Sequence, residues 1–162
     1  MRRRELLLAA GTATLATPAA ALGKTPTEGD VLLDLMRREQ SAKLAYGAAL
    51  KALGSQAPQE LVTIRRHESD HADALTTELA AVGLGRPLRP PLSGAAQELA
   101  EASDRRAVLE ASVKLEDELV DAYRQSLPLL PDAKIAMTVA TILASHAQHR
   151  FIVGLAAGGS GS

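Results

Sequence analysis

One pattern of apolar and polar residues occurs twice in this chain, and the repeat constrains the fold more than any other feature. Glu39 is followed by Tyr46 seven residues later, and Glu116 is followed by Tyr123 at the same spacing. Further matches occur at an offset of 77 or 78 residues, pairing Ala45 with Ala122, Leu50 with Leu127, Leu53 with Leu130, Ile64 with Ile142, Glu68 with His146 and His71 with His149. At 162 residues the chain is long enough for one domain and too short for two. The repeat therefore predicts two similar halves within a single domain.

Each half contains two stretches in which apolar residues recur every three or four positions, as on one face of a helix. Capping and turn residues set the expected helices: Pro26 to Leu53 behind a capping box of Thr25 and Glu28, Pro58 to Val82 before Gly83, Arg105 to Leu127 behind Asp104, and Ala133 to Ala157 behind Asp132. The buried face of the second helix should extend as far as Val82. That of the third should contain Ser112 or Val113, and Leu119 or Val120.

Together these helices predict an all-α fold, an antiparallel four-helix bundle. Aromatic residues make up only 2% of the chain, while alanine and leucine are abundant, which favours helices over strands. Residues 84–106 lose the helical period and contain several glycines and prolines, leaving room for one short helix near 93–102. Short links within each half and one long connection between helices two and three are typical of two helical hairpins joined by a crossover.

Six polar residues fall on the faces that should be buried: Glu39, Glu68, His71, Glu116, His146 and His149. Burying a charge without a partner is costly, so these groups need a cation, hydrogen bonds or a proton. The chain has no cysteine, so a metal ion would be held by nitrogen and oxygen atoms alone. Two alternatives follow: the six residues bind a transition-metal ion, or they hydrogen-bond to one another in a metal-free core.

Other polar residues near these six are expected to have different roles. Tyr46 and Tyr123 should donate hydrogen bonds behind the buried glutamates or fill the core. Three residues beside the buried face of helix two are expected in solvent, namely His67, Asp70 and Asp73. Glu118 should also face outward, and it would replace Glu116 only if the third helix were rotated relative to this prediction.

This arrangement resembles the ferritin-like superfamily of di-iron and di-manganese bundles, which carry a glutamate on helices one and three and Glu-x-x-His on helices two and four. Glu39, Glu68 with His71, and Glu116 match that pattern, whereas His146 stands where the family has a glutamate. The resemblance implies that Glu39 and Glu116 are terminal ligands, that Glu68 bridges, and that the three histidines bind through nitrogen. With three glutamates, both a mononuclear and a dinuclear site are open. Iron is expected first, with manganese, zinc and copper as alternatives.

The function that this resemblance implies is an exported protein with one or two transition-metal ions and oxidase or peroxide-reactive chemistry. The alternative is a metal-free protein for structure, stress protection or partner binding, so turnover itself stays open. Metal storage in a cage is a weaker third alternative, because nothing in the sequence encodes a shell interface. Within the superfamily, the run Leu115-Glu116-Asp117-Glu118 and the proline-containing crossover look most like the exported bacterial proteins related to the desiccation-associated group.

The beginning of the chain predicts export by a twin-arginine-like signal. Residues 1–23 combine Arg2-Arg3-Arg4, an apolar run and the small residues Ala19-Ala20-Ala21. An ordinary secretory signal and an uncleaved anchor are the alternatives. After removal of the signal no stable membrane span is expected, and the protein would lie in the periplasm, in the cell envelope or outside the cell. The bundle should then occupy 24–157 and a flexible tail 158–162.

The charge of the chain narrows the classes of partner. A net charge of −1 offers no basic surface for nucleic acid, so no nucleic-acid partner is expected. Metal ions are the expected partners, and a homodimer is left open.

Overall fold

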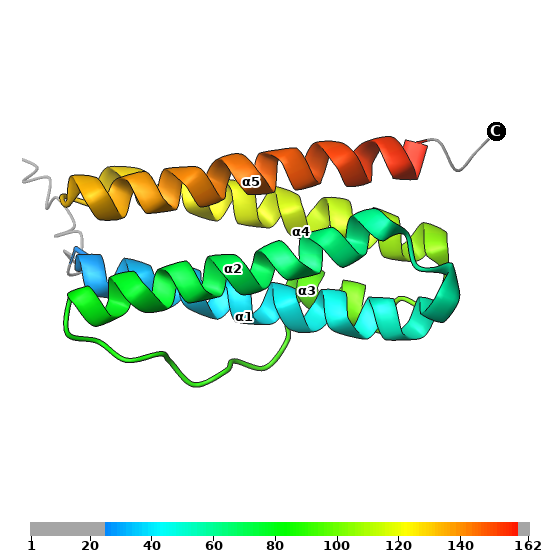
Figure 1. Cartoon of the computed structure of the whole chain (residues 1–162), viewed down its shortest axis with the longest axis horizontal. Helices are drawn as coiled ribbons and strands as arrows, with labels where there is room; N and C mark the ends of the chain where they lie inside the picture. Colours follow the sequence, from blue (N-terminus) through cyan, green and yellow to red (C-terminus); the bar gives the residue numbers. More distant parts are fainter. Residues whose placement is uncertain (1–24, 159–162) are drawn as a thin grey trace, which may run out of the picture.

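The computed structural model describes residues 25–158, and all of their regular secondary structure is helical (Figure 1). Five α-helices are present: α1 (Glu28–Leu53), α2 (Gln59–Ala81), α3 (Gly94–Glu101), α4 (Arg105–Ser126) and α5 (Ala133–Gly158). Two short 3-10 helices, η1 (Gly54–Gln56) and η2 (Leu127–Leu129), lie in the links within the two halves. The predicted all-α class is confirmed. The predicted signal over 1–23 lies outside the described residues, as does all of the predicted tail except Gly158.

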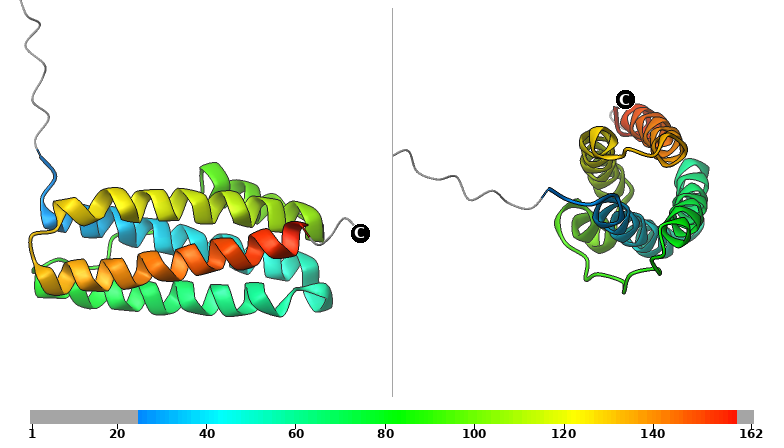
Figure 2. Two further views of the ribbon diagram at one scale, coloured as in Figure 1. Left: turned by 90° about the horizontal axis from the view of Figure 1, so that it is seen from above. Right: turned by 90° about the vertical axis from the view of Figure 1, so that its left-hand side faces the viewer.

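The four long helices surround a common axis, as the end-on view in Figure 2 shows. α1 packs mainly against α2, and α4 packs mainly against α5, so each half of the repeat forms a hairpin. The two hairpins meet where α2 lies beside α5 and α1 lies beside α4. The long connection after α2 runs along the outside of the bundle and leads into α3, which packs against α1 and α4. The predicted bundle of two hairpins with one crossover is confirmed.

The start of α1 differs from the prediction. Thr27, rather than Thr25, is the N-cap: its hydroxyl oxygen accepts a hydrogen bond from the backbone N–H of Asp30 at 3.2 Å. The Asp30 carboxylate in turn accepts from the backbone N–H of Thr27 at 2.9 Å. Two overlapping capping boxes are present in the sequence, and the second one is used. Pro26 therefore precedes α1, and Pro58 is likewise the residue before α2 and not its first member.

The other helix ends follow the predicted capping residues. Asp104 accepts a hydrogen bond from the backbone N–H of Ala107 at 2.9 Å, at the start of α4. Asp132 does the same for the first turn of α5. Gly54 (φ 55°) and Gly83 (φ 77°) take left-handed conformations directly after α1 and just beyond α2, where a side chain would be strained.

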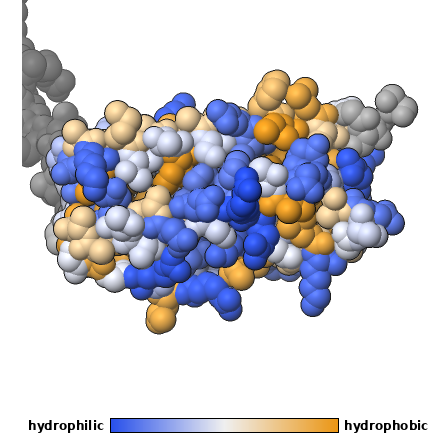
Figure 3. Space-filling model, viewed as in Figure 1, coloured by the Kyte–Doolittle hydropathy of each residue, from blue (hydrophilic) through white to orange (hydrophobic). Residues whose placement is uncertain are grey.

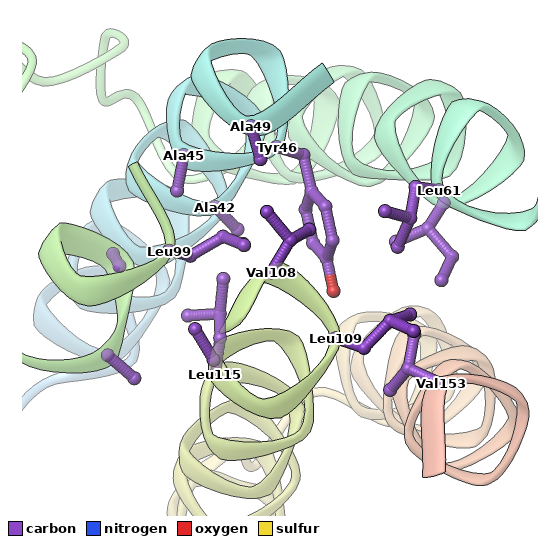
Figure 4. Close-up of a cluster of buried hydrophobic side chains, with 14 of the residues drawn as sticks. Ala42, Ala45, Tyr46, Ala49, Leu61, Leu99, Val108, Leu109, Leu115 and Val153 are labelled. Atoms are coloured by element: carbon purple, nitrogen blue, oxygen red, sulfur yellow. The ribbon is translucent and has the colours of Figure 1, made fainter. Parts of the chain in front are cut away.

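Two hydrophobic clusters fill the bundle on either side of the buried polar residues. One contains Tyr46, Leu61, Leu99, Leu109 and Val153 (Figure 4). The other is formed by Leu32, Leu35, Leu75, Leu79, Tyr123 and Val139. In α1, α2 and α5 the glutamates and histidines that the sequence predicts on the buried faces lie between these clusters in sequence. The apolar layers therefore hold the polar residues at one level of the bundle.

The structure resolves the open alternatives in the buried faces. Ser112 and Leu119 are buried in α4, whereas Val113 and Val120 are only partly buried. The Ser112 hydroxyl donates to the backbone carbonyl of Val108 at 2.8 Å, so its burial leaves no donor unpaired. The predicted burial of Val82 is wrong, because α2 ends at Ala81 and this side chain is 36% exposed.

The face of the bundle in Figure 3 is largely hydrophilic, with hydrophobic residues gathered in separate places. Phe151, Ile152 and Leu155 are exposed on the C-terminal part of α5. Between residues 25 and 158, none of the helices combines the length and the apolar character needed to cross a bilayer.

Candidate metal centre

All six polar residues that the sequence places on buried faces meet inside the bundle. The first hairpin supplies Glu39 from α1 and both Glu68 and His71 from α2. The second supplies Glu116 from α4 and both His146 and His149 from α5. Every one is buried, and His71, at 8%, is the most exposed. Glu118 is exposed, so the predicted register of the third long helix is confirmed.

His146 lies at the centre of this cluster and contacts a carboxylate on each side. Its Nε2 is 3.0 Å from Glu39 Oε1, and its Nδ1 is 2.9 Å from Glu116 Oε2. An ionised carboxylate only accepts hydrogen bonds, so in the metal-free protein both ring nitrogens carry a proton. Burial by itself lowers the pKa of His146, but the charge of Glu39 and the hydrogen bonds to both glutamates outweigh burial and raise it to about 10. The same contacts hold the pKa of Glu39 far below its usual range despite burial.

Two buried tyrosines tie the hairpins together around this centre. The Tyr46 hydroxyl of α1 donates to Glu116 Oε1 of α4 at 2.6 Å. The Tyr123 hydroxyl of α4 donates to Glu39 Oε1 of α1 at 2.5 Å. Burial, followed by the charge of the neighbouring glutamate, raises the pKa of both tyrosines well above 10, so they remain neutral donors. Each tyrosine therefore donates to a buried glutamate, and its role behind a metal ligand stays a prediction.

Glu68 differs from the other two glutamates because neither of its carboxylate oxygens has a hydrogen-bond partner among the described residues. Its side chain is fully buried, and two histidine nitrogens lie near it, His149 Nδ1 at 3.4 Å and His146 Nδ1 at 3.9 Å. Burial, then the charges of Glu39 and Glu116, raise the pKa of Glu68 well above its ordinary value. A buried carboxyl group without partners is costly, and a cation would remove that cost.

Other buried donor atoms in the cluster are also without hydrogen bonds within the described part of the chain: Glu39 Oε2, His71 Nδ1 and His149 Nδ1. Together with Glu68 they belong to two overlapping sets of ligand atoms. The first set comprises Glu39, Glu68, His71 and His146, and the second comprises Glu68, Glu116, His146 and His149. Within each set the ligand atoms lie within 4.8 Å of one another. Nitrogen and oxygen ligands about 2.0–2.2 Å from one ion are separated by at most about 4.4 Å, so small side-chain movements would close either set.

His67 is part of this site, although the sequence pattern places it in solvent. It is half-buried, and its Nδ1 lies 2.9 Å from Nε2 of His149. Ser145 Oγ is 3.3 Å from the same nitrogen. These contacts occupy the outer nitrogen of His149 and leave Nδ1 facing Glu68. His67 precedes His71 by four residues, about one helical turn. This spacing was the sequence signal that could have placed His67 near the site. Asp70 and Asp73 are exposed as predicted.

His149 is neutral in the metal-free protein. Burial, followed by the charges of the other histidines, lowers the pKa of His149 to about 3. A neutral imidazole with a free lone pair is the form that binds metal ions. The residues present therefore fit a transition-metal site of carboxylate oxygens and imidazole nitrogens.

The ferritin-like domain family has a sequence model that matches residues 15–158 of this chain. The chain belongs to this family. Two solved structures share the ferritin-like fold. One is a conserved hypothetical protein from Mycobacterium tuberculosis, with a TM-score of 0.69 and 16% identity, over 79% of this chain and 88% of the other. The second is a hypothetical protein from Methanococcus jannaschii, with a TM-score of 0.70 and 16% identity, over 88% of each chain.

At 16% identity these likenesses show the ferritin-like fold and nothing about ligands. No curated protein sequence matches the chain. What the buried residues of this ferritin-like protein bind must therefore be argued from their own geometry.

Proposed function

We propose that this ferritin-like protein binds transition-metal ions at its six buried glutamates and histidines, and that the bound metal reacts with oxygen or peroxide. Glu68 carries this proposal, because both oxygens of a fully buried carboxyl group lack hydrogen-bond partners among the described residues. In a metal-free core such a group only destabilises the fold. As a ligand shared by the two sets of donor atoms, it would have a partner for each oxygen.

The donor chemistry favours iron within this proposal. Three imidazole nitrogens among the ligands suit iron, zinc or copper better than magnesium or calcium, which prefer oxygen ligands. Manganese, zinc and copper remain alternatives to iron. A bound iron or copper ion would supply one-electron chemistry toward oxygen or peroxide.

The residues of the chain would prepare this site in three ways. Tyr46 and Tyr123 hold one oxygen each of Glu116 and Glu39 by hydrogen bonds and so orient the carboxylates. The flanking leucines exclude water, which strengthens every charge interaction inside. His67 and Ser145 contact the outer nitrogen of His149 and keep its inner nitrogen facing Glu68.

Export of the folded protein is a further part of the proposal. It is supported by Arg2-Arg3-Arg4 and the apolar run of residues 1–23. The twin-arginine route carries proteins that have already folded around a cofactor, which suits a buried metal site. A relation to the desiccation-associated proteins stays a prediction from the sequence.

One observation favours the metal-free alternative as a second candidate. His146 already pairs with both Glu39 and Glu116 by direct contacts and offsets one of their two charges, and the two tyrosines donate hydrogen bonds to the same carboxylates. Such a network could serve a purely structural protein that keeps the bundle for stability or partner binding.

Elemental analysis of the purified protein separates the two candidates. The full chain is folded with iron, manganese, zinc and copper all available, beside a His71→Ala/His149→Ala variant. We expect one or two transition-metal ions per chain, lost in the variant, and oxygen or peroxide consumption by the loaded protein. A well-folded native protein without bound metal would overturn the proposal and leave the structural alternative.

A further inference from the structure

The ring of His146 stands between the two sets of donor atoms, with one nitrogen facing each set. Nε2 lies 3.0 Å from Glu39 Oε1, and Glu39 also contacts His71 Nδ1, at 3.4 Å. Nδ1 lies 2.9 Å from Glu116 Oε2, and Glu116 also lies 3.7 Å from His149 Nδ1. The ring is fully buried, so both nitrogens are shielded from bulk solvent. A ring in this place can bind one ion through each nitrogen.

The buried atoms that lack hydrogen bonds lie on both sides of this ring. Glu39 Oε2 and His71 Nδ1 belong to the first set, and His149 Nδ1 belongs to the second. Glu68 belongs to both sets, and both of its oxygens are without partners within residues 25–158. A single ion would use one set and leave unpartnered atoms in the other. The presence of unpartnered ligand atoms on both sides of the ring therefore favours two ions.

We propose that His146 binds two divalent metal ions at once, as an imidazolate that bridges them. This inference rests on the proposed metal-binding function. Glu39, Glu68 and Glu116 provide three negative charges, and the imidazolate provides a fourth, so two divalent ions are neutralised completely. A neutral His146 would leave one positive charge without compensation in a buried core, which is costly. As the ions bind, the ring releases both of its nitrogen-bound protons and Glu68 releases its carboxyl proton to solvent, and no electron is transferred.

An imidazolate bridge predicts an unusual distance between the ions. Two metal–nitrogen bonds of about 2.0–2.1 Å on opposite sides of a ring separate the ions by roughly 6 Å. Two-metal sites bridged more closely have separations of about 3.5–4 Å. The distance therefore distinguishes a ring that bridges from a ring that binds one ion only.

The test uses the full chain loaded with Zn²⁺ or with Cu²⁺. Anomalous diffraction from Zn²⁺-loaded crystals measures the number of ions and their separation. Low-temperature EPR of the Cu²⁺-loaded protein measures magnetic coupling, because two Cu²⁺ ions on one imidazolate couple through the ring. We expect two ions roughly 6 Å apart, from the bond lengths given above, and an EPR signal far weaker than that of two isolated ions.

Three variants sharpen the test. His146→Gln can serve only one ion, so it should lose the second ion and restore the signal of an isolated Cu²⁺. His146→Glu supplies a fourth carboxylate instead of a ring, so it should keep two ions but shorten their separation to about 4 Å. Asp70→Asn changes an exposed residue of α2 that belongs to neither set of ligand atoms, and it should leave separation and coupling unchanged.

The outcomes separate this inference from the proposed function. Two ions about 4 Å apart in the native protein, or a single ion per chain, would overturn the bridge and leave metal binding intact. No bound ion in a folded native protein would overturn both. The native measurements decide the question even if a variant of His146 fails to fold.

Discussion

Raising the pH should destabilise the metal-free protein, and His146 determines most of the effect. The pKa of this imidazole is about 10 in the folded protein, against an ordinary value of 6.5. Between these two pH values the folded protein holds a proton that the unfolded chain has released. The stability that this proton contributes is therefore complete below pH 6.5 and is lost as the pH rises through about 10.

The magnitude follows from the linkage between protonation and folding. Each pH unit in this window removes up to about 1.4 kcal/mol of unfolding free energy, so the loss from pH 7 to pH 9 is roughly 2–3 kcal/mol. Glu68 acts in the same direction, because burial and the charges of Glu39 and Glu116 raise its pKa well above 4.5. The unfolding free energy of a domain is about 5–15 kcal/mol, so a change of this size is easily measured.

Urea unfolding followed by far-UV circular dichroism, with a chelator present, measures this free energy at half-unit steps from pH 7 to pH 9. The control is His146→Gln, in which the lysines and tyrosines still titrate, so the difference between the two slopes isolates His146. Parallel slopes, or a native protein that gains stability with pH, would refute the imidazolium between Glu39 and Glu116. If the variant does not fold, ¹⁵N NMR of the native ring follows the same proton directly.

Two further predictions concern the hydrogen bonds around the centre. Tyr123→Phe removes the donor to Glu39, so the unfolding free energy of the metal-free protein should fall by about 1–3 kcal/mol. Urea unfolding measures this change, with Tyr46→Phe compared in the same assay. An unchanged value would show that this hydrogen bond contributes nothing to stability. His67→Phe keeps a ring but loses the contact with His149, so the affinity for Zn²⁺ should fall about 10–100-fold in a competition titration, with His67→Gln recovering part of the loss. Equal affinities of native protein and His67→Phe would mean that His67 does not position His149.

Much of the fold could be predicted from the sequence because the relevant signals are local. The apolar period of each long helix and capping residues such as Asp104 and Asp132 depend only on nearby residues, and the structure confirms them. The positions of the polar residues follow from the same period. Once Glu68 and His71 fall on the buried face of a helix, their partners must come from the buried faces of the other helices.

The features that the sequence missed depend on how helices pack against each other. Whether His67 faces solvent or α5 depends on the position of His149 across the interface, which the period of α2 does not contain. The tyrosines show the same limit: each one reaches the glutamate of the opposite hairpin, and the spacing within a hairpin does not reveal this. At the start of α1 the failure is local, because two capping boxes overlap and only one is used.

The replacement of a glutamate by His146 can account for both the stability of the metal-free core and the binding of two ions. A glutamate at this position would change its charge only between 0 and −1. An imidazole spans +1 to −1: as an imidazolium it is a cation between Glu39 and Glu116, and as a bridging imidazolate it would complete the charge needed by two divalent ions. Glu68, at the matching position in the other half of the repeat, does not need three charge states. Burial raises its pKa and favours its neutral form until a cation binds. One substitution within a symmetric repeat would thus let protons reduce the charge of the cluster without metal, and let two metal ions neutralise it without those protons.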